Sequence, residues 1–551
     1  MAVNCLLAQA QLQLNGKDII RDNRAGQWLC TIPDSVFGTD YEARVTVLPE
    51  SGWTDVMVDG VPVDDGQSIW FAPVDGVKPH TISAQVGDST VSGTLLFSCL
   101  PLLEVDAVIS KDYQPARFRL HHPDSITPME LQGRFKLRGQ TTMMAGRHKH
   151  NFHIKLEDEL GEKLNKKLLG MRDDNSWLLD AGQTDLSRIR NHVAHELWLD
   201  MATKPYYADR EPKARTACRG ELIEVLINGN YEGIYTLMEA MDRKQLKLAK
   251  YETDTAAVTT LHGQLWKAVD YTGGTTFTSV KEYDNNSETW FGFETKYPEL
   301  DEVSPTDYSL LYNSIVFAYS SYDNLWRRKA KDYFDIPVMR DYYILLQVLL
   351  AIDNGNKNIY WAVYDKQVDN KLTLAVWDLD CTVGQDWTND PFRLESRVGP
   401  ERKFGIGNNV LGRLNLLIEG FHEDMVARYQ ELRKGVLHAD SITQRYLSHI
   451  DCLIHAGAAA RECTRWDGDD DLGGHILDWE AEKAYIADWL QRRLHYLDVN
   501  TFASAAIDDI VADEPTVVPS GTYNLLGQRM PDDCPLPPGF YVHNGKKMIK
   551  N

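Results

Sequence analysis

Hydrophobic and polar residues alternate near the start of the chain, which is the pattern of half-buried strands. Ala43-Arg-Val-Thr-Val47 and His80-Thr-Ile-Ser-Ala84 are two such runs, and Gly, Asp and Pro residues separate the runs. Val58-Asp-Gly60 is a hairpin signal. The pattern predicts an Ig-like β-sandwich over residues 11–105.

From about residue 106 the period changes, and long amphipathic segments alternate with short apolar runs. Residues 185–201 carry apolar side chains at the spacing of one helix face, with Asp185 or Ser187 as the N-cap. Residues 341–352 and 476–497 are also predicted helices. Strands mixed with long helices predict an α+β domain over residues 106–503.

Turn-forming residues mark the end of that domain. Residues 504–518 are rich in Ala, Asp and Pro and predict a linker. Residues 519–551 return to a β pattern with glycines at the turns, so a small C-terminal β module is expected. At the other end, Ala8-Gln-Ala10 closes a segment, residues 1–10, that resembles the end of a signal peptide; an ordinary short N-terminus is the alternative.

The composition narrows the range of functions. Hydrophobic residues make up 43% and charged residues 25%, as in a globular protein. The net charge of -22 repels phosphate backbones, so no nucleic-acid partner is expected. No run of about 20 apolar residues occurs, so no membrane span is predicted. None of the 8 cysteines forms a CxxC pair. Cys30 and Cys99 are the candidate pair for a disulfide.

The most informative stretch lies between residues 341 and 384. A predicted helix ends before the polar loop Asp353-Asn-Gly-Asn-Lys-Asn358, and Ile359-Tyr-Trp-Ala-Val-Tyr364 reads as a strand. A second strand, Leu372-Thr-Leu-Ala-Val-Trp377, then ends in Asp378-Leu-Asp380. Protein kinases use this order for a catalytic base, a metal-binding Asn and a metal-binding Asp.

That order has a chemical reason. Asp353 is placed to accept the proton of an acceptor hydroxyl, while Asn358 and Asp378, with Asp380 nearby, offer the oxygen ligands that Mg²⁺ prefers. Loop capping is the structural alternative for Asp353 and Asn358, and a solvated strand end is the alternative for the two aspartates. Which of Asp378 and Asp380 is the main ligand stays open.

A second stretch predicts a glycine-containing hairpin. Strand 133–138 ends at Arg138, the loop starts at Gly139, and the chain returns through Asn151-Phe-His-Ile-Lys155. Backbone N–H groups of such a loop suit phosphate oxygens, and Lys155 is the candidate phosphate-binding lysine, with Lys149 as its competitor. Glu196 on the following helix is predicted to pair with Lys155. Arg188 and Arg190 are alternative anion partners.

Histidines supply a further candidate that the spacing disfavours. His192 and His195 lie on one predicted helix, and His148, His150 and His153 lie in the hairpin. No carboxylate or cysteine completes either set by spacing, so zinc is not expected.

Read together, these residues resemble the CotH-type spore-coat kinase family, a set of atypical secreted or surface kinases. The resemblance covers about residues 106–500. Its blocks are Arg138-Gly139 with His153-Ile-Lys155-Leu156, Trp177-Leu-Leu179 with Ile189-Arg-Asn191 and Glu196-Leu197, Val225 to Tyr235 with Glu239, and Asp353 to Asn358 with Trp377-Asp-Leu-Asp380 and Gly384.

The resemblance implies a kinase-like two-lobed domain that binds ATP with Mg²⁺ or Mn²⁺ and phosphorylates Ser or Thr hydroxyls of a protein. It places the adenine near the backbone at Glu239, between the lobes. A catalytically inactive surface binding protein of the same fold is the alternative, as is a kinase for a sugar or lipid hydroxyl.

The chain departs from the family pattern in the glycine loop, where Gln140-Thr141 replaces the usual Asn-Ser. The nucleotide contacts are therefore less firmly indicated than the metal ligands. The flanking modules resemble those of secreted multidomain proteins from Bacteroidetes-type bacteria, in which some C-terminal β modules act in sorting. Secretion or display at the cell surface is therefore expected.

Overall fold

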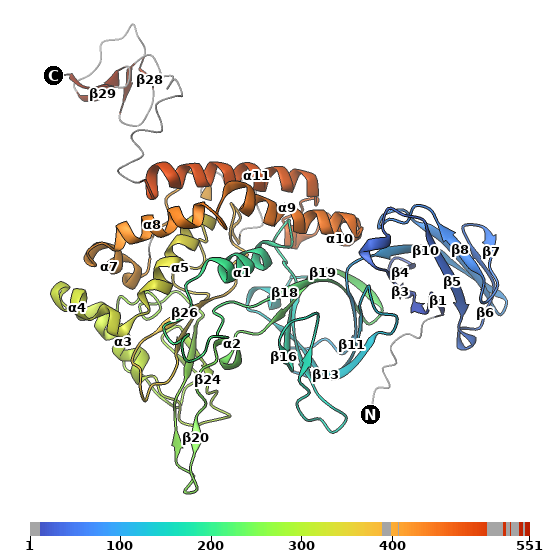
Figure 1. Cartoon of the computed structure of the whole chain (residues 1–551), viewed down its shortest axis with the longest axis horizontal. Helices are drawn as coiled ribbons and strands as arrows, with labels where there is room; N and C mark the ends of the chain where they lie inside the picture. The colour runs from blue at the N-terminus through green and yellow to red at the C-terminus, as the bar shows by residue number, and fades with distance from the viewer. Residues whose placement is uncertain are drawn as a thin grey trace. The chain divides into compact units, whose positions relative to one another are not determined.

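The computed structural model describes residues 11–387, 398–405 and 407–503, together with four short strands between residues 522 and 550 (Figure 1). The chain divides into two compact units, Met1–Phe502 and Ala503–Asn551. The predicted signal-peptide remnant at 1–10 and linker at 504–518 lie outside the described residues. In the second unit one sheet has the order β28-β27-β29-β30. Its strands are β27 (Thr522–Asn524), β28 (Arg529–Met530), β29 (Gly539–His543) and β30 (Lys546–Lys550).

Two sheets enclose the core near the N-terminus. One has the order β2-β1-β5-β8, the other β3-β4-β10-β9-β6-β7. The strands are β1 (Leu12–Leu14), β2 (Lys17–Asp18), β3 (Ile20–Asp22), β4 (Gln27–Thr31), β5 (Tyr41–Val47), β6 (Trp53–Val58), β7 (Val61–Pro62), β8 (Ser68–Phe71), β9 (His80–Val86) and β10 (Ser89–Ser98). Trp28 and Phe97 lie in the core between the two sheets.

The Ig-like assignment of this region stays a prediction. Cys30 and Cys99 are free thiols, so the considered disulfide is not formed.

A closed β-barrel follows, seen as a ring in Figure 1, with the order β11-β12-β13-β14-β17-β19-β18. Its strands are β11 (Leu102–Ala107), β12 (Gln114–His121), β13 (Met129–Arg138), β14 (Asn151–Leu156), β17 (Ser176–Asp180), β18 (Gly220–Ile227) and β19 (Asn230–Glu239). Along β14, Phe152 and Ile154 fill the barrel interior, because side chains alternate across a strand. His153 and Lys155 therefore lie on the outer surface.

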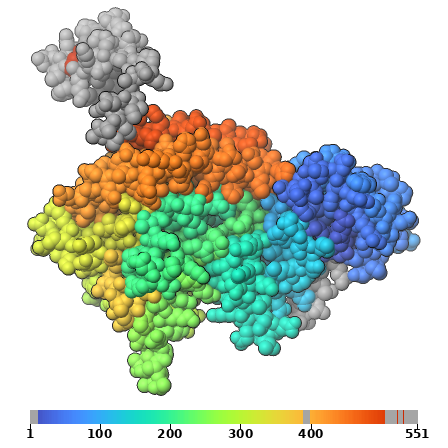
Figure 2. Space-filling model, in the orientation of Figure 1, coloured from blue at the N-terminus to red at the C-terminus, as the bar shows by residue number. Residues whose placement is uncertain are grey.

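The remaining elements surround the largest core. A sheet of order β23-β24-β22-β25-β26 combines β22 (Gln264–Ala268), β23 (Thr289–Trp290), β24 (Phe293–Tyr297), β25 (Ile359–Val363) and β26 (Thr373–Val376). The helices are α1 (Arg190–Met201), α2 (Arg243–Leu246), α3 (Ser309–Ser320), α4 (Asp323–Tyr333), α5 (Ile336–Leu349), α7 (Asn409–Leu417), α8 (Phe421–Arg433), α9 (Ala439–His455), α10 (Ala458–Trp466) and α11 (Trp479–Tyr496). Figure 2 shows α7 to α11 as one layer, in orange to red. The predicted α+β class is confirmed by this mixture of strands and helices.

The helix predicted at 185–201 begins later than the pattern suggested. Asp185 is no N-cap; its carboxylate accepts hydrogen bonds from the backbone N–H groups of Ser187 and Arg190, both at 2.8 Å, and so holds the turn before α1. The Arg190 guanidinium also pairs with Asp185 at 2.6 Å and with Glu482 at 2.6 Å, all three buried. Arg190 is thus used to fix α1, which leaves it unable to serve as the alternative anion partner.

No helix in the described part of the chain has the length and apolarity needed to cross a bilayer.

Candidate active site

The loop after α5 and the loop after β26 meet at one end of the β25–β26 hairpin. Ile359 pairs with Val376 in the antiparallel register. Asn358 therefore precedes the hairpin at the same end at which Asp378 follows it. Both residues adopt a left-handed backbone, with φ of 57° and 56°. Asparagine and aspartate tolerate this conformation better than other residues with side chains, so the sequence suits both turns.

Asp353 is held by three side chains of this region. Its carboxylate accepts hydrogen bonds from the Tyr271 hydroxyl at 2.9 Å and the Asn358 amide at 2.9 Å, and the Lys357 ammonium lies 3.0 Å away. Asp353 is only 8% exposed. Burial raises the pKa of Asp353, and the contacts of Lys357 and Tyr271 oppose this shift. The result is an oriented carboxylate with increased proton affinity.

Three more carboxylates gather beside Asp353. Burial raises the pKa of Asp380 well above its usual range, and the negative charges of Asp378, Asp180 and Asp353 raise it further. Asp380 accepts one hydrogen bond, from the Cys381 backbone N–H at 2.8 Å. Burial and the Asp378 carboxylate likewise raise the pKa of Asp180. The site thus concentrates negative charge.

Asn191 joins two of these acidic segments, and the sequence reasoning did not assign it or Asp180 to the site. The Asn191 amide nitrogen donates to the Asp180 carboxylate at 2.5 Å, while its oxygen accepts from the Leu379 backbone N–H at 2.9 Å. One side chain at the start of α1 therefore holds β17 against the loop that carries Asp378. A usable signal was present: Trp177-Leu-Leu-Asp180 and Trp377-Asp378 both end a buried strand with an acid.

Two cations from different sheets lie near the acidic cluster. The Arg138 guanidinium, at the end of β13, lies 5.4 Å from the ring centroid of Trp377, and the Lys267 ammonium, on β22, lies 5.6 Å from the same ring. Burial lowers the pKa of Lys267 to about 8, although the nearby Asp378 carboxylate opposes the shift. The predicted Arg138 is thus beside the metal-ligand candidates, and Lys267 is a cation that sequence reasoning missed.

Gly139 is required by a close contact in the loop after β13. Its φ is 93°, and a Cβ at this position would lie 2.6 Å from the Thr142 hydroxyl oxygen. That hydroxyl donates to the Arg138 carbonyl at 2.7 Å and closes the turn. The glycine therefore folds the loop back onto itself directly after Arg138.

Lys155 lies at the opposite end of the same strand pair. Asn151 pairs with Arg138, and Lys155 is four residues further along β14, about 13 Å at the usual strand rise. Its ammonium lies 5.0 Å from the Tyr113 ring centroid, and burial lowers the pKa of Lys155. The competing candidate, Lys149, is fully buried and pairs with Glu462 at 2.6 Å, which identifies it as a structural residue.

The predicted pair of Lys155 and Glu196 is wrong. Glu196 contacts His449 at 3.0 Å and Arg445 at 3.7 Å. The reason is topological, because β17 lies between β14 and β19 in the sheet and is the strand that precedes α1. Glu196 therefore faces α9, and the predicted contact that would orient Lys155 is not formed.

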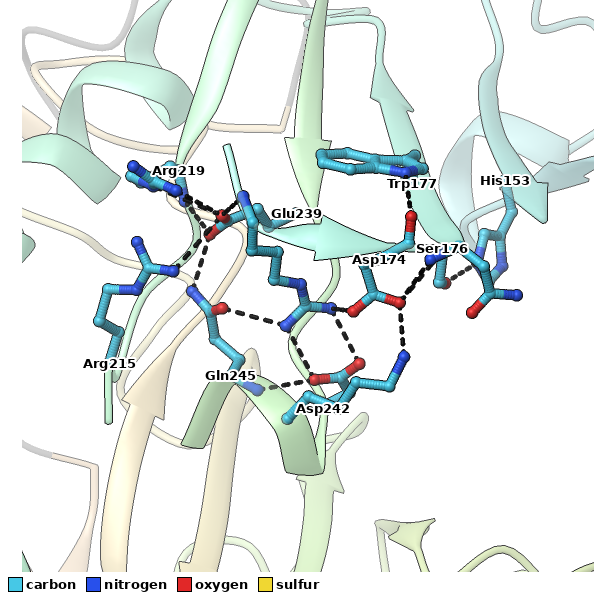
Figure 3. Close-up of polar contacts among 12 residues, drawn as sticks. His153, Asp174, Ser176, Trp177, Arg215, Arg219, Glu239, Asp242 and Gln245 are labelled. Atoms are coloured by element: carbon cyan, nitrogen blue, oxygen red, sulfur yellow. Dashed lines mark hydrogen bonds and ion pairs between the residues drawn. The ribbon is translucent and has the colours of Figure 1, made fainter. Parts of the chain in front are cut away.

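Glu239 ends β19 inside a network of basic side chains. Figure 3 shows Arg215, Arg219 and Gln245 turned toward its carboxylate. The Gln245 amide donates at 3.0 Å, and the two guanidinium groups lie at 3.5 Å and 3.1 Å. Because the Glu239 side chain is fully buried, it cannot contact a nucleotide. The predicted contact through its backbone remains a prediction.

A second network of charged side chains lies next to the Glu239 network. Arg172 pairs with Asp174 at 2.8 Å and with Asp242 at 2.9 Å, and Lys244 pairs with Asp174 at 2.6 Å. Figure 3 also shows His153 and Ser176 nearby, where the Ser176 hydroxyl contacts His153 at 2.7 Å. Around Glu239, each acid therefore has basic partners.

The ligand types of the acidic cluster suit a divalent cation. Carboxylates of Asp378 and Asp380 and the amide oxygen of Asn358 belong to the hard oxygen ligands that Mg²⁺ and Mn²⁺ take. In the same loop, the buried amide oxygens of Asn354 and Asn356 have no hydrogen-bond donor among the described residues. A bound cation would offset the negative charge of the acidic cluster that Arg138, Lys267 and Lys357 do not balance.

The fold and the site together define an α+β protein with a basic-flanked carboxylate cluster suited to a metal and an anionic ligand. The family model described as CotH kinase protein matches residues 135–497, about two thirds of the chain. The chain belongs to the CotH kinase family, and phosphotransfer with ATP and a divalent metal is the class of chemistry this family suggests. No curated protein matches the chain significantly.

Proposed function

We propose that this protein transfers the γ-phosphate of ATP to a Ser or Thr hydroxyl of a protein substrate, with Mg²⁺ or Mn²⁺. The observation that carries the proposal is the gathering of Asp180, Asp353, Asp378 and Asp380, in which burial and the charges of the other three acids raise the pKa of Asp380. A fold does not assemble unbalanced carboxylates for stability, since each one costs desolvation energy. Clusters of this kind mark functional sites.

The transfer itself needs one proton acceptor. The hydroxyl oxygen of the substrate bonds to the γ-phosphorus while the bond from that phosphorus to the bridging oxygen breaks, and ADP leaves with the electron pair. The proton of the hydroxyl passes to the Asp353 carboxylate. Tyr271 and Lys357 hold that carboxylate in one orientation, and its raised pKa favours proton acceptance.

The other residues bind and position the nucleotide. Arg138 and Lys267 neutralise phosphate oxygens next to Trp377, and the Gly139 loop offers backbone N–H groups. Lys155 contacts the nucleotide further along β14. Asn358, Asp378 and Asp380 would hold the metal, which neutralises phosphate charge when bound. Asn191 is a positioning residue that keeps Asp180 and the Asp378 loop together.

We further propose that the protein acts after export, in the medium or at the cell surface. The support is the resemblance of its flanking segments to those of exported proteins. Fractionation of the producing cells, with detection of the full chain, tests this placement. Recovery in the cytoplasm alone would overturn it.

The decisive experiment uses the purified full chain with labelled ATP and Mn²⁺, followed by mass analysis for phosphorylated Ser or Thr. Asp353→Ala and Asp378→Ala are each expected to remove transfer and keep the fold. Asp440→Asn is the matched control, because that side chain is 92% exposed on α9. Wild-type turnover in either alanine variant would refute its assigned role. Nucleotide binding without transfer to any hydroxyl would instead identify an inactive binding protein.

A further inference from the structure

Three metal-ligand side chains meet between α1 and α9. His192 and Glu196 are one helical turn apart on α1 and face the same side. His449 reaches them from α9. The Glu196 carboxylate oxygens lie 3.6 Å from the His192 Nε2 and 3.0 Å from the His449 Nε2, and one ligand atom of each residue lies within 4.8 Å of the others. The two imidazole planes are nearly perpendicular, at 81°.

These separations match a metal site. Bonds of about 2.0–2.1 Å in a tetrahedron place neighbouring ligand atoms about 3.4 Å apart, between the two measured distances. Two imidazoles with one carboxylate suit transition metals of the zinc class rather than Mg²⁺ or Ca²⁺, which take oxygen ligands. We propose that His192, Glu196 and His449 bind Zn²⁺ or a chemically similar divalent cation, with solvent as the fourth ligand.

The surroundings of the triad suit this role. His192 is 6% exposed and its ring packs against Gly220, where a Cβ would lie 3.3 Å from the Nδ1. The side chains of Glu196 and His449 are 33% and 24% exposed, so a cation can enter from solvent.

Neighbouring charges also permit a cation. Arg445 lies 3.7 Å from Glu196 but pairs more closely with Asp200, at 2.5 Å. Glu221, on the adjacent strand β18, feels the Glu196 charge: desolvation and that carboxylate raise its pKa. The carboxylates of Glu196 and Glu221 therefore lie near this position, while the nearby Arg445 is paired with Asp200 and Arg219 is paired with Glu239.

Two other groups of ligand-type side chains in the described residues are less suited. Asp471, beside His148 and Asp469, already accepts hydrogen bonds from the backbone N–H groups of His148 and Lys149, both at 2.8 Å. Asp34 and His455, beside Cys99, have side chains 75% and 50% exposed and are weakly held. The α1–α9 triad alone among these combines two histidines with a buried member.

The position of the triad suggests its consequence. Asn191, which holds the acidic site together, directly precedes His192 on α1. A metal that joins α1 to α9 would therefore fix the helix that carries Asn191. The metal would act as a structural clamp on α1, away from the phosphate-transfer residues.

Metal binding is tested on the purified full chain, stripped with a chelator and held in excess Mg²⁺ so that the oxygen-rich site is saturated. The probe is Co²⁺, whose four-coordinate complexes absorb strongly in the visible range, followed by displacement with Zn²⁺. The wild-type protein is expected to bind one equivalent of Co²⁺. His449→Ala and Glu196→Gln should each weaken Co²⁺ binding by at least about 100-fold, since even loss of an outer partner costs 10–100-fold. His455→Ala, at the end of the same helix, should bind as wild type.

Unfolding temperatures provide a readout that is independent of phosphotransfer. Zn²⁺ should raise the unfolding temperature of the wild type and of Asp378→Asn, but not that of Glu196→Gln. No Co²⁺ binding by the wild type would overturn the proposal. So would binding that His449→Ala and Glu196→Gln leave unchanged, or binding lost only in Asp378→Asn, which would place the ion in the acidic cluster. Failure of phosphate transfer has no bearing on these outcomes.

Discussion

Two groups of carboxylates in the described part of the chain differ in how their charge is balanced. The Glu239 carboxylate is contacted by Arg215, Arg219 and Gln245. Close by, Arg172 pairs with both Asp174 and Asp242. At the end of the β25–β26 hairpin, four acids share the environment, and the pKa of Asp380 is raised well above its usual range. A balanced network stabilises a junction, whereas an unbalanced one is poised to bind a cation.

The largest expected effect comes from removing one acid of the unbalanced cluster. Under the proposed function, Asp378→Asn should lower the rate of phosphate transfer by at least about 1,000-fold, because it would remove a ligand for the charge-neutralising cation at unchanged shape. Steady-state transfer from labelled ATP measures this, with circular dichroism to confirm the fold. A variant that turns over within a few-fold of wild type would show that Asp378 is not needed.

In the balanced cluster the same kind of change should cost stability instead. Glu239→Gln breaks a buried pair and should reduce the free energy of unfolding by about 3–5 kcal/mol. Although burial opposes it, Arg215 and the N–H groups of Arg172 and Arg219 lower the pKa of Glu239. Its contribution is therefore present above pH 4.5 and lost as the pH falls through the lowered value. Denaturant unfolding at pH 7 and pH 4 checks both statements, and an equal loss at both pH values would contradict the second.

Mg²⁺ or Mn²⁺, unlike the Zn²⁺ proposed for the α1–α9 triad, should stabilise only the protein with an intact acidic cluster. At 100 times its dissociation constant, Mg²⁺ or Mn²⁺ adds about 2.7 kcal/mol to the folded state. Thermal unfolding of the wild type and of Asp378→Asn, with and without the ion, measures the difference. If the ion raised the unfolding temperature of both proteins equally, ion binding would not depend on Asp378.

The smallest expected effect is a gain in stability. The raised pKa of Asp380 means that its ionisation destabilises the folded protein as the pH rises above the unfolded value of 3.8. Asp380→Asn should therefore unfold at a higher temperature than wild type at pH 7 without divalent ions. The advantage should shrink as the pH falls and vanish below the unfolded value of 3.8, where the wild-type carboxyl is protonated in both states. A lower unfolding temperature at pH 7 would show that Asp380 is already compensated.

Prediction from the sequence succeeded where neighbours in the chain decide the outcome. The helix ending before Asp353, the turn at Asn358 and the strand ending before Asp378 follow from local period and turn chemistry, and the hairpin register then places them together. The pairing of Glu196 failed, because which face of α1 meets α9 depends on segments about 250 residues apart. No spacing rule reports such a contact.

The chain by itself determined its α+β class, its acidic charge, the order of its motifs and its membership in the CotH kinase family. These properties depend on patterns of neighbouring residues, which can be recognised in the sequence without a structure. Only the tertiary structure showed that Asn191 ties Asp180 to the Asp378 loop, that Lys267 and Arg138 both lie near the Trp377 ring, and that His449 completes a triad with His192 and Glu196. The packing of distant elements selects such partners, because charge and shape must match in space at once.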